Sequence, residues 1–166
     1  MKHHRTTARA ATAAVIAIAA STLIAGPADS TPATGFTAAQ QWKGVYGPLD
    51  VNADKTDAWD VKIRSKDTSD VYVTRNAIDI DGQSGWHTHP GPSLITVTLG
   101  EVTVYESSLC TPVRYHMGEG FVDSGGGHVH LIRNESGAAA ETVAVQFVPQ
   151  GATRRIDAPQ PNNCNF

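Results

Sequence analysis

Four histidines of this chain stand in two His-x-His pairs, His87-Thr88-His89 and His128-Val129-His130, each set in a glycine-rich stretch. Side chains two positions apart on a β-strand point to the same face of a sheet, so each pair can aim two imidazoles at one point. Imidazole is the commonest protein ligand for divalent transition metals. The two pairs therefore predict a metal site, provided that the fold brings them together.

The elements that must position these pairs are short β-strands. From residue 59 onward, β-rich runs of roughly four to ten residues alternate with glycine-rich turns. The runs cover 59–64, 71–80, 86–89, 94–99, 102–105, 113–117, 120–123, 129–134 and 142–148. This spacing is typical of an all-β sandwich or barrel. Upstream, residues 36–43 predict one short helical turn, and residues 44–57 an irregular segment.

The N-terminus has the layout of a Sec-type secretory signal peptide over residues 1–28. Lys2, Arg5 and Arg9 precede an apolar run of about 16 residues, and the small-residue exit Gly26-Pro27-Ala28 follows. The run is short for a membrane span of about 20 residues, and no second apolar run follows; an uncleaved anchor is the alternative. We expect a secreted protein with no membrane association after cleavage.

The charge that remains after cleavage excludes some partners. Loss of the three basic signal residues leaves ten Lys and Arg against 16 Asp and Glu, a formal charge of −6. Such a chain is poorly suited to nucleic acid or to an anionic membrane surface. The remaining length of about 138 residues is enough for one domain with a single core. Function should therefore involve small molecules or proteins.

Two cysteines, Cys110 and Cys164, are the only ones in the chain. An oxidising compartment favours their pairing, and the long loop that they close gives a stabilisation of about 4 kcal/mol on the chain-entropy estimate. Two free thiols or intermolecular pairing are the alternatives. The expected layout is a lead-in and irregular segment over 29–57, a barrel over 58–157, and a tail over 158–166 held by the Cys110–Cys164 disulfide.

The surroundings of the histidine pairs resemble the two sequence motifs of the cupins. The segment Gly85-Trp86-His87-Thr88-His89-Pro90-Gly91-Pro92-Ser93, with Gly100 beyond it, is similar to the first motif, which has His-x-His, a Glu and a later Gly. Gly127-His128-Val129-His130-Leu131-Ile132-Arg133-Asn134 is similar to the second, which has Gly, His and Asn at this spacing. The resemblance spans roughly residues 70–149. It implies a double-stranded β-helix (a jelly-roll barrel) with a metal ion inside, held by His87, His89 and His130.

The chain departs from the cupin pattern at two positions that matter. Ser93 stands where the first motif has its Glu, and no carboxylate lies between His89 and Gly100; Gly125 stands where the second motif usually has Pro. Three neutral imidazoles leave the charge of a divalent ion uncompensated, which favours an anionic or chelating ligand. His128 is either a fourth ligand in place of the Glu or a residue that supports the ligands from the rim. Ser93 would be a small polar group beside the metal.

Strand alternation gives the expected pocket wall. If His87 and His89 face inward, then Ser93, Ile95, Val97 and Leu99 form the inner row of the next strand, and Leu94, Thr96 and Thr98 lie outside. A mostly apolar pocket with a few converging polar groups suits a small molecule. The fifth histidine of the mature chain, His116, lies in an expected edge strand and is interpreted as a surface residue.

The sequence predicts one divalent transition metal ion (Fe, Mn, Zn, Ni or Cu) and a small-molecule ligand. Three classes of function stay open. The first is a metal-dependent enzyme, a dioxygenase acting on a small anionic substrate or an isomerase. The second is a non-catalytic extracellular module that binds a small ligand or a carbohydrate, and the third is a barrel that has lost its metal. The resemblance also implies a homodimer formed through edge strands.

Overall fold

The β-rich runs of the sequence form strands in the computed structural model, which describes residues 30–53 and 55–162. The strands of this part of the chain are β1 (Thr34–Tyr46), β2 (Leu49–Asn52), β3 (Lys62–Ser65), β4 (Ser69–Gln83), β5 (His87–Thr88), β6 (Ser93–Leu99), β7 (Glu101–Glu106), β8 (Val113–His116), β9 (Gly120–Asp123), β10 (His130–Arg133), β11 (Ala140–Pro149) and β12 (Ile156–Asp157). No helix of these residues has the length and apolar character that a membrane span requires. The expected signal peptide and Cys164 lie outside the described residues, so the Cys110–Cys164 pairing stays a prediction.

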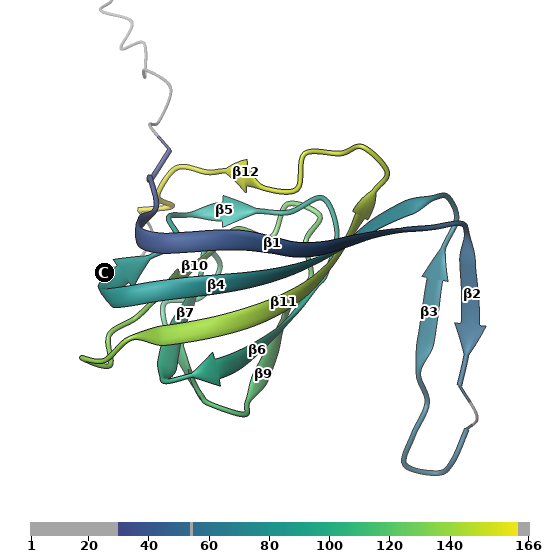
Figure 1. Cartoon of the computed structure of the whole chain (residues 1–166), viewed down its shortest axis with the longest axis horizontal. Coiled ribbons are helices and arrows are strands. Elements are labelled where there is room, and N and C mark those ends of the chain that lie inside the picture. Colours follow the sequence, from purple (N-terminus) through teal and green to yellow (C-terminus); the bar gives the residue numbers. More distant parts are fainter. Residues whose placement is uncertain (1–29, 54, 163–166) are drawn as a thin grey trace, which may run out of the picture.

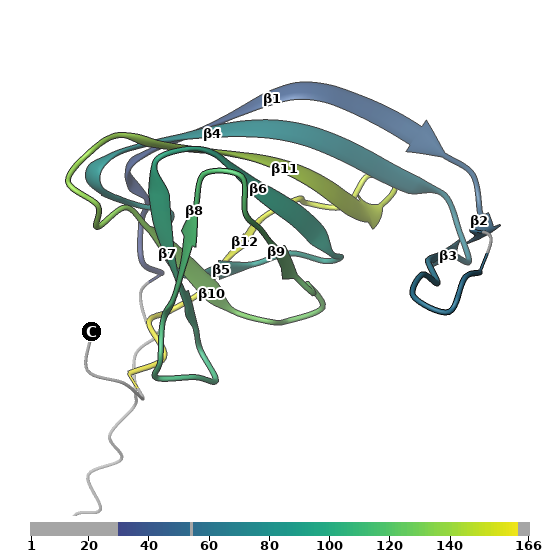
Figure 2. The ribbon, with the colours of Figure 1, turned by 90° about the horizontal axis from the view of Figure 1, so that it is seen from below.

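The strands build two curved, antiparallel layers that face each other and nearly close a barrel (Figures 1 and 2). One layer has the strand order β1-β4-β11-β6-β9, and the other has β12-β5-β10-β7-β8. The layers join where β10 pairs with the end of β4, at Arg133 and Gln83. The all-β barrel that the sequence predicts is confirmed. Its closure brings β5, β6, β9 and β10 around one interior, where the two motifs meet.

Strand β1 corrects the expectation for the N-terminal segment. The prediction of a helical turn over residues 36–43 is wrong, because these residues pair with β4 from Thr34↔Gln83 to Tyr46↔Ser69. Residues 38–41 (Ala-Ala-Gln-Gln) have high helix propensity. The edge of β4 offers a long row of backbone partners from far along the chain, and this tertiary pairing outweighs the local preference.

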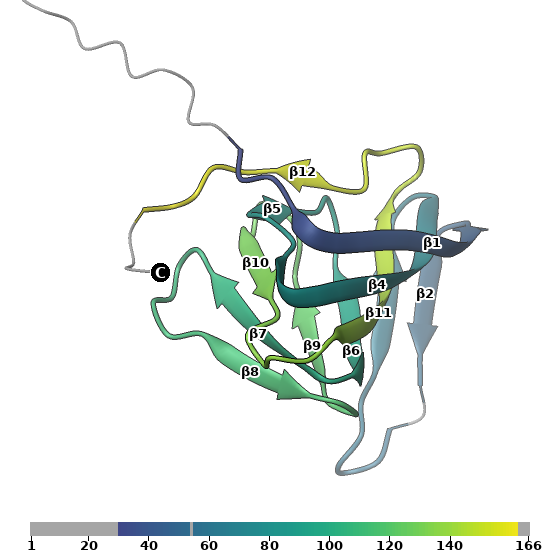
Figure 3. The ribbon, with the colours of Figure 1, turned by 60° about the vertical axis from the view of Figure 1, so that its left-hand side comes forward.

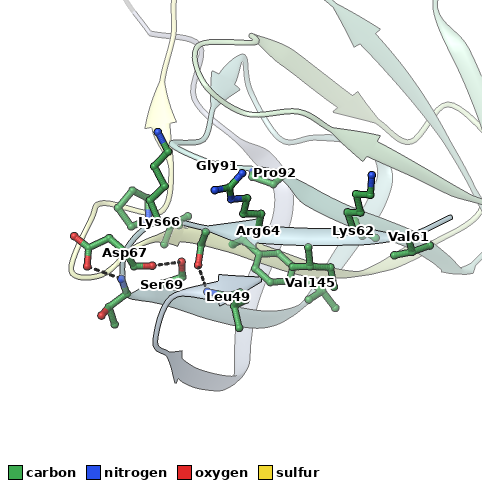
Figure 4. A pocket seen from close by; sticks show the side chains of 17 residues that line it. Leu49, Val61, Lys62, Arg64, Lys66, Asp67, Ser69, Gly91, Pro92 and Val145 are labelled. Atoms are coloured by element: carbon green, nitrogen blue, oxygen red, sulfur yellow. Dashed lines mark hydrogen bonds between the residues drawn. The ribbon is translucent and has the colours of Figure 1, made fainter. Parts of the chain in front are cut away.

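A hairpin made of β2 and β3 projects from one end of the barrel as a separate two-stranded sheet (Figures 1 and 3). The run predicted at 59–64 belongs mainly to this hairpin and not to the barrel. Between the hairpin and the outer face of β6 and β11 lies an apolar groove of about 870 Å³, which Figure 4 shows with Val145 and Arg64 on its walls. The described residues that line this groove include no histidine.

The inner faces of the strands alternate as the sequence predicts. On β6, alternate residues from Ser93 to Val97 are buried, and those from Leu94 to Thr98 are exposed. Leu99 is 44% exposed, against the prediction, because it stands at the Gly100 turn where the barrel ends. The buried apolar cluster beneath the histidines contains Ile78, Ile95, Val97, Val102, Val104, Phe121, Ile132, Ala140 and Ala144. Burial of each larger side chain stabilises the fold by roughly 1.5–3 kcal/mol.

Candidate metal centre

Three histidines of the two motifs converge inside the barrel. His87 opens β5, His89 follows this strand, and His130 opens β10 as the direct cross-strand partner of His87. The ring centroids of His87 and His130 are 4.3 Å apart, those of His87 and His89 4.9 Å, and those of His89 and His130 5.5 Å. One nitrogen from each ring lies within 4.8 Å of the other two. The predicted grouping of these three residues therefore exists in the fold.

Backbone carbonyls orient two of these rings for a metal. His87 Nδ1 donates a hydrogen bond to the carbonyl of Gly85 at 2.8 Å, and His89 Nδ1 donates one to the carbonyl of Arg154 at 2.7 Å. A carbonyl can only accept, so Nδ1 carries the proton in both neutral rings and Nε2 keeps its lone pair. This arrangement, with one ring nitrogen held by the protein, is the usual setting of a metal-binding histidine.

Burial keeps the three imidazoles neutral. Desolvation lowers the pKa of His87 to about 2 and also lowers the pKa of His89. Desolvation lowers the pKa of His130 to about 4, although the charge of Asp123 opposes this shift. At neutral pH the cluster therefore offers lone pairs and no positive charge, which is the protonation state that a metal ion needs.

The three histidines line a small cavity of about 60 Å³, which has room for a few water molecules. Other residues that line this cavity are Phe36, Ala38, Thr74, Asn76, Ser93, Ile95, Ile132, Ala144, Gln146, Arg154 and Arg155. Several buried polar atoms here, His130 Nδ1, Ser93 Oγ and Gln146 Oε1, have no hydrogen-bond partner among the described residues. Buried polar atoms without partners are costly in a native fold. Because these atoms lie at one cavity, the cavity is a candidate binding site for an ion or a polar ligand.

His128, the remaining histidine of the second pair, has a different role. Its Nδ1 lies 3.1 Å from Asp123 Oδ1 and its Nε2 lies 3.1 Å from Glu106 Oε2. Partial burial would lower the pKa of His128, but the two carboxylates outweigh it and raise the pKa. With both nitrogens bonded to acids, His128 bridges Asp123 and Glu106. This geometry suits a supporting residue, and His128 would have to release one of these hydrogen bonds to act as a fourth ligand.

Sequence reasoning missed Asp123. This residue ends β9, is 3% exposed, and has Oδ2 3.9 Å from His89 Nε2 and Oδ1 3.6 Å from His130 Nδ1. A signal was available, because the alternation that buries Phe121 also predicts an inward Asp123. The cupin pattern has its acid between His89 and Gly100, whereas Asp123 lies on β9, a different strand.

Arg154 is a second residue that sequence reasoning missed. It lines the cavity beside the histidines, and its Cζ lies 5.7 Å from the centroid of the Tyr72 ring. The arginine ion pairs of the described residues involve Arg75, Arg114, Arg133 and Arg155, but not Arg154. Burial lowers the pKa of Arg154, yet a guanidinium stays protonated in proteins. The cavity therefore has one half-buried cation without an acidic partner in the described part of the chain.

Comparison with known proteins gives structural neighbours. No protein-family model matches the sequence, and a search of curated proteins finds no match. A cupin superfamily protein from Desulfitobacterium hafniense DCB-2 matches 63% of this chain and 78% of its own, at 10% identity and a TM-score of 0.43. A protein with a double-stranded β-helix domain from Klebsiella pneumoniae matches 68% and 84%, at 19% identity and a TM-score of 0.44.

An oxalate oxidase in complex with the substrate analogue glycolate is another neighbour. It is 22% identical, has a TM-score of 0.46, and matches 52% of this chain. The aligned region spans 45% of that oxidase chain, less than half of its length. Two of these three neighbours are described as a cupin superfamily protein and as a protein with a double-stranded β-helix domain.

Proposed function

We propose that this protein binds one divalent transition metal ion inside its barrel through His87, His89 and His130. The observation that carries the proposal is the convergence of three neutral imidazoles, two of them held by backbone carbonyls with Nε2 left bare. Nitrogen ligands of this kind suit Fe, Mn, Zn, Ni or Cu. The buried polar atoms without hydrogen-bond partners at the same cavity also support this proposal. A bound ion, with its water or ligand, would give these atoms the partners that they lack.

The second ligand of this site is a small anion. Arg154 supplies positive charge at the cavity wall without an ion pair in the described part of the chain, and a guanidinium binds carboxylates through two parallel hydrogen bonds. The cavity volume of about 60 Å³ favours a ligand of few non-hydrogen atoms over a carbohydrate. Charge and size together support the anionic substrate that the sequence suggests.

The reaction class that we propose is a metal-dependent oxygenase. A bound metal ion supplies Lewis-acid or redox chemistry to any ligand that coordinates it. The protein's own contributions are orientation by Arg154, exclusion of bulk water by the buried walls, and fixed imidazole tautomers. We further propose that the protein acts outside the cell, since residues 1–28 have the composition of a signal peptide.

Metal analysis of the purified protein tests the proposal. The protein is stripped with a chelator, reconstituted anaerobically with each candidate metal in turn, and desalted. We expect about one equivalent of at least one metal to be retained, and His89→Ala to retain less than roughly a tenth of an equivalent. Oxygen uptake with a panel of small carboxylates then tests the enzymatic part.

The matched control is His116→Ala, because His116 on β8 has a 64% exposed side chain that pairs with Glu101 on β7. This variant should retain the metal like the wild type. The proposal fails if the wild-type protein retains less than roughly a tenth of an equivalent of every metal tested. It also fails if His116→Ala loses as much metal as His89→Ala.

A further inference from the structure

The carboxylate that the first motif lacks lies directly across the sheet from its expected position. Ser93, at the place of the motif Glu, opens β6, and its cross-strand partner on β9 is Asp123. Both residues are nearly inaccessible, at 2% and 3% exposure. Side chains of directly opposed residues share one face of the sheet, with Cβ atoms roughly 4.5–5.5 Å apart. An acid at Asp123 therefore enters the same interior as an acid at position 93 would.

The two oxygens of Asp123 have different surroundings. Oδ1 accepts hydrogen bonds from the backbone N–H of Gly125 at 3.1 Å and from His128 Nδ1 at 3.1 Å. Oδ2 is buried, has no hydrogen-bond partner among the described residues, and lies 3.9 Å from His89 Nε2. Two atoms that each lie about 2.0–2.2 Å from one ion can be at most about 4.4 Å apart. Asp123 Oδ2 and His89 Nε2 are thus close enough to share an ion. Asp123 does not belong to the group of His87, His89 and His130, whose ligand atoms all lie within 4.8 Å of one another, so shared binding requires the carboxylate to move closer to these histidines.

The two positions at which the chain departs from the cupin pattern, Ser93 and Gly125, both lie beside the Asp123 carboxylate. Gly125 stands where the second motif usually has Pro, and its φ is +66°. A proline has φ near −65° and no N–H, so it can neither adopt this turn nor donate to Asp123 Oδ1. A glycine at position 125 therefore permits the hydrogen bond that holds the Asp123 carboxylate opposite Ser93.

We propose that Asp123 is the carboxylate ligand of the metal centre, through Oδ2, in place of the glutamate whose position Ser93 occupies. The inference rests on the proposed function, because it requires the metal that the three histidines bind. It changes the charge of the centre. A divalent ion with three imidazoles has a net charge of +2, and the Asp123 carboxylate reduces this to +1. Attraction for an anionic ligand then depends more on Arg154 than on the ion alone.

A purely structural role for Asp123 is the rival explanation. His128 and Gly125 already compensate one oxygen of the carboxylate, which would suffice for a buried ion pair. That role leaves Oδ2 without any partner, although it lies beside the histidine cluster. A second grouping of Asp123, His128 and His130 could also hold an ion in principle. It would require His128 to release its hydrogen bond to Asp123 or to Glu106.

Cobalt binding to the purified apo-protein tests the inference, with Co²⁺ alone as the probe. The measurements are the dissociation constant and the visible absorption of bound Co²⁺, which changes with the number and type of its ligands. Asp123→Asn keeps the shape of the side chain, and we expect it to weaken Co²⁺ binding at least about tenfold and to alter the spectrum. Glu106→Gln is the charge-matched control; it removes the other acid on His128, and its affinity should stay within about threefold of the wild type with an unchanged spectrum.

Each outcome has a defined meaning. If Asp123→Asn binds Co²⁺ with the affinity and spectrum of the wild type while His89→Ala does not bind, the inference is wrong and the proposed function stands. If the wild-type protein binds neither Co²⁺ nor any other divalent ion, the proposed function fails and the inference falls with it. Should Asp123→Asn not fold, a crystal structure of the Co²⁺-loaded wild type decides. An Asp123 Oδ2–metal distance of about 2.0–2.2 Å supports the inference, and one beyond about 3 Å overturns it.

Discussion

His87 and His130 face each other as direct cross-strand partners of β5 and β10, although they belong to motifs far apart in the sequence. This pairing decides which histidine of the second motif joins the first. A shift of one residue in the register of β10 would turn His130 away from the interior, because side chains alternate between the two faces of a strand. The convergence of the candidate ligands thus depends on the strand register as much as on the residues.

In the turn that follows Asp123, alanine substitutions at two neighbouring glycines should lower the free energy of unfolding by different amounts. A Cβ at Gly125 would lie 2.3 Å from the carbonyl oxygen of Gly91, whereas a Cβ at Gly126 meets nothing within 4 Å; both residues have positive φ. We expect Gly126→Ala to cost about 1–2 kcal/mol of unfolding free energy from the backbone conformation alone. Gly125→Ala should cost at least about 3 kcal/mol, because the clash adds to the same strain. Urea denaturation of both variants checks this, and equal losses would contradict it.

Truncation of the Asn134 side chain should lower the free energy of unfolding strongly. This residue is fully buried, and its Nδ2 lies within hydrogen-bond distance of the carbonyls of Ile78, Asp79 and Ala138, while its Oδ1 accepts from Ser136. Asn134→Ala should lower the free energy of unfolding by about 2–4 kcal/mol, because it leaves buried carbonyls without donors. Ser136→Ala, at the exposed end of the same network, should cost about 1 kcal/mol or less. Thermal and urea unfolding measure both, and similar costs would show that the network is not the cause.

The neutral histidines predict that the metal-free protein loses stability in acid. The folded-state pKa of His87 is lowered to about 2 and that of His130 to about 4. As pH falls below the unfolded-state value of about 6.5, the unfolded chain takes up protons that the folded chain refuses. Stability therefore falls in this range, by up to about 1.4 kcal/mol per pH unit for His87.

His128 contributes with the opposite sign, since its raised pKa gives stability that is present in acid and lost as pH rises. Urea denaturation with a chelator present, at pH 7 and pH 5, measures the net effect. His87→Gln removes one titrating group and should show a shallower loss between the two pH values than the wild type. An equal slope in the two proteins would refute the assignment of His87 as a buried neutral ring.

Substitution of Arg154 should weaken the binding of an anion without weakening the binding of the metal. Arg154→Gln should weaken the binding of a small carboxylate such as acetate to the metal-loaded protein by about tenfold or more, the usual effect of losing a charged hydrogen bond. Metal content should stay unchanged, because Arg154 holds the His89 ring through its backbone carbonyl, which the substitution keeps. Arg75→Gln, whose side chain pairs with Glu141 on the exposed surface, is the control. Isothermal titration calorimetry measures both affinities, and a parallel loss in Arg75→Gln would exclude a local effect.

The cysteine count predicts a protein without reactive thiols. Before reduction, a thiol reagent should modify fewer than roughly 0.2 equivalents, and after unfolding and reduction about two. Two reactive thiols in the unreduced protein would rule out the Cys110–Cys164 disulfide. Replacement of both cysteines by serine should lower the free energy of unfolding by up to about 4 kcal/mol, which urea denaturation measures.

The sequence alone located most strands of the barrel and the residues at its first motif. Alternation between apolar and polar side chains is a local property, so it located β6 and its inward row from Ser93 to Val97. The spacing of the two His-x-His pairs marked four histidines, and the resemblance to the cupin motifs singled out His87, His89 and His130. The local pattern gave the wrong prediction for β1. The residues of β1 favour a helix, but they form a strand because they pair with β4, which lies far along the chain.

Only the tertiary structure decided which acid stands beside the histidines and which histidine does not join them. Asp123 lies opposite Ser93 because of the register between β6 and β9, and this register cannot be read from the sequence. His128 shares a motif with His130, yet two carboxylates from other segments engage both of its nitrogens. Spacing along one strand fixes the face to which a side chain points. Pairing between strands fixes the neighbours that it meets there, and pairing is set by the closure of the whole barrel.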